Sequence, residues 1–173
     1  MMESRPCVFL DRDGVLNEEL GYQVTRLEEF KVIEDIAAPL QKLKAAGYLL
    51  IVITNQSGIA KGNYDENFVL ECHERIQQAC DGVLDDLYFA PGHESVSKSL
   101  SRKPGSLMFE RAIARHGVNV SESWMIGDKE RDLIPAKKLG MQTIHLTDKQ
   151  ASEYADFKVG HLAEAVEVIR SAQ

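Results

Sequence analysis

Two aspartates stand two positions apart at the end of an apolar run, in the string Asp11-Arg12-Asp13-Gly14. The residues before them, Cys7 to Leu10, are all apolar and predict a short buried strand. Alternate residues of a strand share a face, so the two carboxylates can point the same way, and Gly14 can form a turn. One carboxylate could then attack as a nucleophile while the other transfers protons.

Three later segments carry side chains that suit the transfer of a phosphoryl group. They bring a hydroxyl, a lysine and a further acid, in Thr54-Asn55-Gln56-Ser57, Arg102-Lys103-Pro104 and Gly127-Asp128-Lys129. We place each of them near the end of a predicted strand. The carboxyl ends of parallel strands meet at one crevice of a doubly wound sheet, so these segments can meet the two aspartates there.

The chain around these segments alternates predicted strands with predicted helices. Continuous apolar runs predict strands at 48–53, 87–90, 124–126 and 143–146. Helical spacing and end signals predict helices at 36–47, 65–80, 106–116, 133–139 and 162–169. Asp65 suits the N-cap of the second helix, and Gly117 and Gly140 suit the ends of the third and fourth. We therefore expect an α/β fold, a three-layer, doubly wound and mostly parallel sheet with helices on both faces.

Size and composition narrow the class of protein. The chain has 173 residues, 44% of them hydrophobic and 27% charged, which fits a single soluble domain spanning 1–173. No apolar run approaches the roughly 18 residues of a membrane span. The net charge of -7 argues against nucleic acid and anionic membranes as partners. The first six residues hold no signal-like segment, and the three cysteines lack Cys-x-x-Cys spacing, so we expect a monomer in the cytoplasm.

Taken together, these segments resemble the haloacid dehalogenase superfamily of phosphatases, whose four motifs occur here in order between Phe9 and Gly140. The long string Thr54 to Ala60, together with Asn17 and Gly21-Tyr22, resembles the branch that contains histidinol phosphatases and heptose-bisphosphate phosphatases. The resemblance implies a Rossmann-like fold without a cap domain. It also implies a Mg²⁺-dependent phosphatase that works through an aspartyl phosphate.

The resemblance also implies a role for each motif residue. Asp11 would attack phosphorus, and Asp13 would protonate the departing alkoxide and then activate water. Thr54 and Lys103 would contact the transferring group, so the catalytic residues are expected to be Asp11, Asp13, Thr54 and Lys103. Mg²⁺ would lie between the Asp11 carboxylate, the Asp13 backbone carbonyl and Asp128. Asp132 would brace either the metal site or Lys103.

The substrate is expected to lie under loops alone, because predicted elements fill the intervals between Asp13, Thr54 and Lys103. The selecting loops would be about 17–26, 58–65 and 91–102. In the heptose branch the positions that line the substrate match Glu19, Leu20, Gly21, Tyr22, Thr54, Asn55, Gln56, Ser57, Arg102, Lys103 and Lys129. Arg102 or Lys129 would hold a second phosphate. The expected reaction removes the 7-phosphate of a heptose 1,7-bisphosphate, on the way to lipopolysaccharide and other surface-glycan precursors.

One departure from the branch concerns zinc. Many of its members bind a structural zinc in the loop before Arg-Lys-Pro, but the matching positions here are Ala90, Gly92, Ser99 and Ser101. These side chains cannot supply four zinc ligands, so we expect no structural zinc. The loop would be held by its own turns and hydrogen bonds.

Two other functions remain open from the sequence. Histidinol phosphate is the second candidate substrate, because Glu18, Glu19 or Glu94 could bind its cationic amine. A phospho-receiver signalling domain also places acids, a threonine and a lysine on a doubly wound sheet. An Asp-x-Asp-Gly string is not expected in a receiver, and steady multiple turnover would exclude one.

Overall fold

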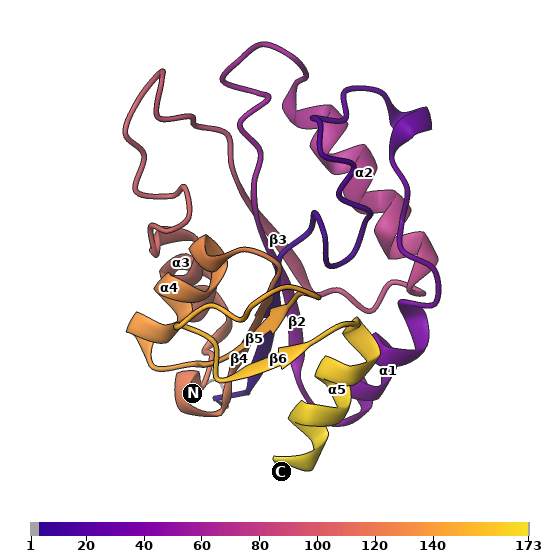
Figure 1. Ribbon diagram of the computed structural model, residues 1–173, viewed down its shortest axis with the longest axis vertical. Coiled ribbons are helices and arrows are strands. Elements are labelled where there is room, and N and C mark those ends of the chain that lie inside the picture. The colour runs from indigo at the N-terminus through magenta and orange to yellow at the C-terminus, as the bar shows by residue number, and fades with distance from the viewer. Residues whose placement is uncertain (1–3, 173) are drawn as a thin grey trace.

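Six parallel strands form one sheet in the computed structural model, which describes residues 4–172 (Figure 1). The strands are β1 (Cys7–Leu10), β2 (Leu49–Asn55), β3 (Asp86–Ala90), β4 (Trp124–Gly127), β5 (Gln142–Leu146) and β6 (Phe157–Val159). Their order is β3-β2-β1-β4-β5-β6, and all five neighbouring pairs are parallel. The strand order therefore reverses between β1 and β4, which is where open α/β sheets bind their ligands.

Helices cover both faces of this sheet. They are α1 (Ala37–Ala45), α2 (Glu66–Ala79), α3 (Leu107–His116), α4 (Glu130–Leu139) and α5 (Leu162–Ser171), with short 3-10 helices at Leu27–Glu29 and Val120–Glu122. Figure 1 shows α3 and α4 on the opposite side of the sheet from α1 and α5. Val8 and Leu10 of β1 pack in one core with α1, α2 and α5, whereas Cys7 and Phe9 pack in the other with α3 and α4. Because alternate side chains enter different cores, the apolar strand is buried on both faces.

The helix ends follow from local chemistry and confirm the predicted signals. Asp65 is the N-cap of α2, and its side chain accepts a hydrogen bond of 3.0 Å from the backbone N–H of Phe68. Gly117 ends α3 and Gly140 ends α4, both in the left-handed conformation that glycine adopts without strain.

Two elements differ from their predictions. The strand β6 was not predicted, because its three residues lie at the sheet edge and Phe157 is partly exposed. The helix α4 begins at Glu130, three positions before the predicted start at Leu133. Its first turn is charged rather than apolar, and acidic residues there are favoured by the helix dipole. Among the helices of the described residues, none is both long enough and apolar enough to cross a membrane.

Candidate active site

The predicted segments meet at the carboxyl ends of β1, β2 and β4. Asp11 directly follows β1, and its backbone N–H donates to the Ile126 carbonyl of β4 at 3.0 Å. Asp128 directly follows β4, and Thr54 is the last residue but one of β2, where it pairs with Phe89 of β3. The point where the strand order reverses therefore gathers the acids and the hydroxyl of the sequence motifs.

Lys103 is the centre of a buried ion cluster. Its ammonium lies 2.8 Å from Asp11 Oδ1, 2.7 Å from Asp132 Oδ1 and 2.7 Å from the carbonyl of Ile53. The ammonium donates hydrogen bonds to Asp11 and to the Ile53 carbonyl, and Asp132 is its second ion-pair partner. Burial alone would lower the pKa of Lys103, but the charges of Asp11 and Asp132 outweigh burial and raise it. Lys103 is therefore a fixed cation, 2% exposed, beside the predicted nucleophile.

Two side chains position this lysine. Asn55 bonds the Lys103 backbone at both its N–H and its carbonyl, at 2.9 and 3.1 Å. Asp132, in the first turn of α4, also accepts the backbone N–H of Lys129 at 3.1 Å. A side chain at Gly127 would place its Cβ only 2.4 Å from the Cβ of Asp132, so glycine permits this close packing. Of the two roles expected for Asp132, the geometry favours bracing Lys103.

Asp13 lies in a separate, less buried cluster. Its Oδ1 accepts from Arg12 Nη2 at 2.9 Å and from Asn17 Nδ2 at 3.1 Å, and its Oδ2 accepts from Gln56 Nε2 at 3.0 Å. The Arg12 guanidinium stacks over the ring of Phe30, 5.3 Å from its centroid. Burial alone would raise the pKa of Asp13, but the Arg12 charge and these hydrogen bonds outweigh it and lower the pKa.

The pKa of Asp11 is shifted in the opposite direction to that of Asp13. Burial, and then the negative charge of Asp132, raise the pKa of Asp11 to about 6, although Lys103 acts against them. Burial and the charge of Asp11 also raise the pKa of Asp128. Several carboxylates are thus held close together with too little positive charge around them.

These acids fit a hard divalent cation. Carboxylate oxygens of Asp11, Asp128 and Asp132 lie within 4.8 Å of one another. Asp128 Oδ1 is buried and has no hydrogen-bond partner among the described residues, whereas its Oδ2 accepts from Lys129 Nζ at 2.8 Å. The side chain of Asp13 is hydrogen-bonded to Arg12, Asn17 and Gln56, and the resemblance implies its backbone carbonyl as the ligand. Oxygen donors of this kind suit Mg²⁺.

Gly14 allows the close packing of the backbone against Asp128 in this acidic cluster. Gly14 has a φ of 84°, and a Cβ there would lie 2.4 Å from Asp128 Oδ2. Any other residue would be strained and would also displace the Asp128 carboxylate. The glycine of the Asp-x-Asp-Gly string therefore serves the position of Asp128 as well as the turn.

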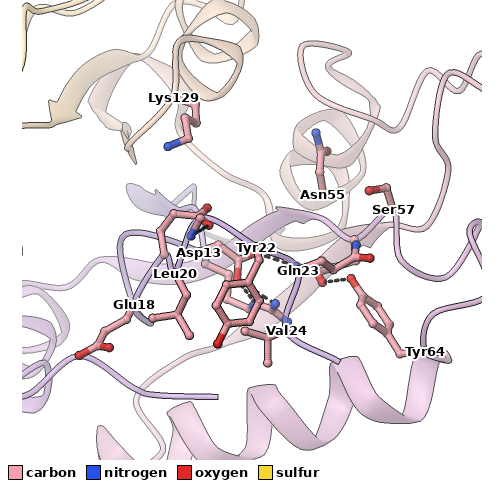
Figure 2. A pocket seen from close by; sticks show the side chains of 14 residues that line it. Asp13, Glu18, Leu20, Tyr22, Gln23, Val24, Asn55, Ser57, Tyr64 and Lys129 are labelled. Carbon is pink, nitrogen blue, oxygen red and sulfur yellow. Dashed lines mark hydrogen bonds and ion pairs between the residues drawn. The ribbon is translucent and has the colours of Figure 1, made fainter. Parts of the chain in front are cut away.

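A cleft of about 460 Å³ opens over the Asp13 cluster (Figure 2), and its lining does not include Asp11, Asp128 or Lys103. Its lining includes eight predicted substrate-binding residues, Glu19, Leu20, Gly21, Tyr22, Asn55, Gln56, Ser57 and Lys129, and also Arg12, Asp13, Glu18, Gln23, Val24 and Tyr64. The other predicted residues do not line it. Thr54 and Lys103 are fully buried, and Arg102 lies to the side, where its Nη1 donates to the Gly92 carbonyl at 3.4 Å.

Tyr64 is one of the lining residues that sequence reasoning did not single out. It falls in the predicted loop 58–65, but no motif or spacing distinguishes it from its neighbours. Its hydroxyl donates to Gln56 Oε1 at 2.8 Å, and its ring lies so close to Gly58 that a Cβ there would be 2.2 Å away. Only the path of the loop, which returns over the end of β2, brings Tyr64 to the site.

The loop at 91–102 is held by short-range polar contacts. Ser99 Oγ and Ser101 Oγ are 2.7 Å apart, and the Ser101 N–H donates to Ser99 Oγ at 3.3 Å. Gly92 lies against Ser99, and the Ser95 N–H donates to His93 Nδ1 at 3.2 Å. Two of the positions that match zinc ligands thus hydrogen-bond to each other.

Comparison with known proteins places these features among phosphatases. A family model described as HAD-hydrolase-like matches residues 100–166. The chain is 38% identical to a D-glycero-beta-D-manno-heptose-1,7-bisphosphate 7-phosphatase of Haemophilus ducreyi, over 80% of this chain and 81% of that protein. It is 35% identical to the enzyme of the same name from Pasteurella multocida, over 94% and 93% of the two chains.

A solved structure agrees in fold. The crystal structure of D,D-heptose 1,7-bisphosphate phosphatase from B. bronchiseptica, complexed with magnesium and phosphate, superposes with a TM-score of 0.84. The match covers 97% of this chain and 99% of that one at 24% sequence identity. The predicted Rossmann-like fold is thereby confirmed.

Proposed function

This chain belongs to the HAD-like phosphatases, together with the heptose-bisphosphate phosphatases that it matches, and we propose from this premise that it removes the 7-phosphate of D-glycero-D-manno-heptose 1,7-bisphosphate. One observation carries the proposal: Asp11, Asp128 and the Lys103 ammonium meet at the point where the strand order reverses, and Asp13 follows two residues after Asp11. The names and the coverage of the relatives support the choice of substrate.

Asp11 is the nucleophile in this proposal. Lys103 holds Oδ1, which leaves Oδ2 to attack. The attack forms a bond from the carboxylate oxygen to phosphorus and breaks the bond from phosphorus to the sugar oxygen, giving an aspartyl phosphate and an alkoxide. Water then attacks the same phosphorus, which releases inorganic phosphate and restores the Asp11 carboxylate.

Asp13 moves the protons of both steps, and Oδ2 is the oxygen that carries them. Oδ1 accepts hydrogen bonds from Arg12 and Asn17, whereas Oδ2 accepts only one, from Gln56, and keeps a lone pair free. In the first step Asp13 gives its proton to the alkoxide, and in the second it takes a proton from water. A bound phosphate dianion adds a like charge beside Asp13 and so raises its pKa, which favours the acid form that the first step needs.

Positive charge and hydrogen-bond donors offset the phosphate charge. Asp11, Asp128 and the Asp13 carbonyl would hold Mg²⁺, which when bound reduces the repulsion between these acids and the substrate. Lys103 adds its fixed positive charge, and the Thr54 hydroxyl donates to a phosphoryl oxygen.

The cleft rim selects the sugar. The segment from Glu19 to Tyr22 forms one wall, and Lys129 stands on the other (Figure 2). Lys129 is proposed to contact the 1-phosphate because it lines the cleft, with Arg102 as a second cation from the neighbouring loop.

The test compares phosphate release from heptose 1,7-bisphosphate and from histidinol phosphate with Mg²⁺ present, as kcat/KM. We expect a preference of up to about 100-fold for the bisphosphate, since one charged contact contributes up to about 3 kcal/mol. A preference for histidinol phosphate would overturn the substrate, and a single turnover with no further release would indicate a receiver. Chelation should stop the release while the circular dichroism spectrum stays unchanged.

A further inference from the structure

The predicted acid/base and the predicted phosphate hydroxyl share one buried neighbour. Gln56 is 2% exposed, and its Nε2 donates both to Asp13 Oδ2 at 3.0 Å and to Thr54 Oγ1 at 2.8 Å. Its Oε1 accepts from the Tyr64 hydroxyl at 2.8 Å (Figure 2). Although Gln56 lines the cleft, every polar atom of its side chain is already bonded within the protein.

Chemistry fixes the direction of these hydrogen bonds. An ionised Asp13 can only accept, so the end of the amide that faces Asp13 must be the NH₂ group. The other end is then the carbonyl, and Tyr64 must donate to it. Burial raises the pKa of Tyr64, so its hydroxyl keeps its proton at neutral pH. A carbonyl facing Asp13 would instead repel the carboxylate.

The direction matters most at Thr54. Its Oγ1 accepts a hydrogen bond from Gln56 Nε2, so its own hydroxyl proton remains available to donate to another acceptor. A phosphoryl oxygen needs such a donor. If the Gln56 amide rotated by 180°, its carbonyl would face both Thr54 and Asp13. The Thr54 hydroxyl would then donate its hydrogen bond to the Gln56 carbonyl, and Asp13 would lose the hydrogen bond that it accepts from Gln56.

We propose that Tyr64 is a positioning residue for the phosphatase reaction, because its hydroxyl locks the Gln56 amide in the one orientation that serves Asp13 and Thr54 together. The inference rests on the proposed function. Tyr64 acts only through Gln56, and its effect should fall on the chemical step rather than on the binding of the sugar.

Tyr64 also packs, and that structural role must be separated from the hydrogen bond. Its ring lies 4.9 Å from the ring of Phe68 and covers Gly58. Tyr64→Phe keeps the ring and removes only the hydroxyl, whereas Tyr64→Leu removes the ring as well. Tyr154→Phe is a matched control, because Tyr154 packs against the core on the α3 and α4 side and does not line the cleft.

The kinetic test measures kcat and KM for these variants. We expect Tyr64→Phe to lower kcat by about tenfold, as the loss of one buried hydrogen bond allows, with KM changed by less than about twofold. Its thermal midpoint should fall below that of Tyr154→Phe by no more than the loss of one buried hydrogen bond allows. In a Gln56→Leu background, adding Tyr64→Phe should cause no further loss of kcat. If Tyr64→Phe were as active as the wild type, or if its effect persisted without Gln56, the proposal would be overturned.

A second test does not depend on activity. The side-chain amide signals of Gln56 in a ¹⁵N-labelled protein can be assigned by their loss in Gln56→Glu. We expect them to move in Tyr64→Phe and not in Tyr154→Phe, because the amide loses its fixed partner. Unmoved signals would refute the lock even if the wild type released no phosphate, whereas moved signals in an inactive wild type would refute only the proposed reaction.

Discussion

Asp11 and Asp13 are two positions apart, yet they lie in opposite surroundings. Asp11 is buried with two other acids and a single lysine, and its pKa rises to about 6. Asp13 is more exposed and is bonded by Arg12, Asn17 and Gln56, and its pKa falls. The difference shows how one strand end can support two roles, because surroundings that separate the pKa values of paired acids allow them to divide the chemistry.

The largest effect should come from removing the nucleophile. Asp11→Asn keeps the shape and the contact to Lys103, but it should lower kcat by on the order of 10⁴-fold or more. In metal-free protein the same change should raise the free energy of unfolding, because a buried charge disappears. Steady-state phosphate release and urea denaturation measure the two effects. Retained turnover would rule out the covalent route.

Asp13→Asn should lower kcat by about 10²- to 10⁴-fold, since general acid/base catalysis contributes that much. Its effect on stability should have the opposite sign to that of Asp11→Asn, with a loss of about 1 kcal/mol as Arg12 loses its charged partner. Urea denaturation of both variants side by side tests the comparison. Stability changes of the same sign would mean that the two surroundings do not differ as described.

Lys103→Met tests the ion cluster itself. It leaves Asp11 and Asp132 buried without a cation, and it should lower the free energy of unfolding by about 3–5 kcal/mol. Lys137→Met is the matched control, because Lys137 pairs with Asp156 at the surface, and its loss should cost no more than about 1 kcal/mol. Similar losses of unfolding free energy in the two variants would mean that burial does not make the Lys103 ion pairs more important to stability than a surface pair.

The pH dependence of stability should differ between wild type and Asp11→Asn. The pKa of Asp11 is about 6 in the folded protein and 3.8 by its ordinary value, so the folded state binds the proton more tightly. In metal-free wild type this contribution should therefore increase stability as pH falls from about 6 to 3.8, by on the order of 1–3 kcal/mol. It should be lost as pH rises through 6. Parallel pH profiles of the two proteins, from urea midpoints, would show that Asp11 does not titrate in this range.

The smallest effect is expected outside both clusters. Ser99→Ala removes the contact with Ser101 in the partly exposed loop and should lower stability by less than about 1 kcal/mol. The kcat should stay within about twofold of the wild-type value. A large loss of kcat would mean that this loop, rather than the two acids, limits the reaction.

Much of the fold follows from patterns that the sequence displays directly. Apolar runs located β1, β2 and β4, and capping residues such as Asp65 and Gly117 located helix ends. The edge strand β6 was not predicted, because a strand of three residues with one buried position shows no periodic pattern in the sequence. The start of α4 was not predicted, because its first turn is charged. Asp132 of that turn is buried only because it forms an ion pair with Lys103.

The candidate site divides in the same way. Motif residues at strand ends can be found from their order, since the topology of a doubly wound sheet brings them together. Tyr64 could not be predicted from the sequence, because its contact with Gln56 depends on how a surface loop folds back. The burial of Thr54 and the position of Arg102 beside the cleft could not be predicted either, because they depend on side-chain packing rather than on strand order.

The rim and the floor of the cleft are physically separable, and this affects how such an enzyme can change its substrate. The floor consists of buried, mostly paired polar side chains such as Arg12 and Gln56, whereas the rim and the adjoining loop expose Tyr22 by 57% and Leu100 by 78%. Substitutions at exposed positions rarely change stability by more than about 0.5 kcal/mol. Libraries that randomise 19, 20, 22, 23 and 94–100, but keep Gly21 with its φ of 77°, should thus contain mostly folded proteins with an intact floor. Evolution has the same freedom to recruit this scaffold for a new phosphate ester.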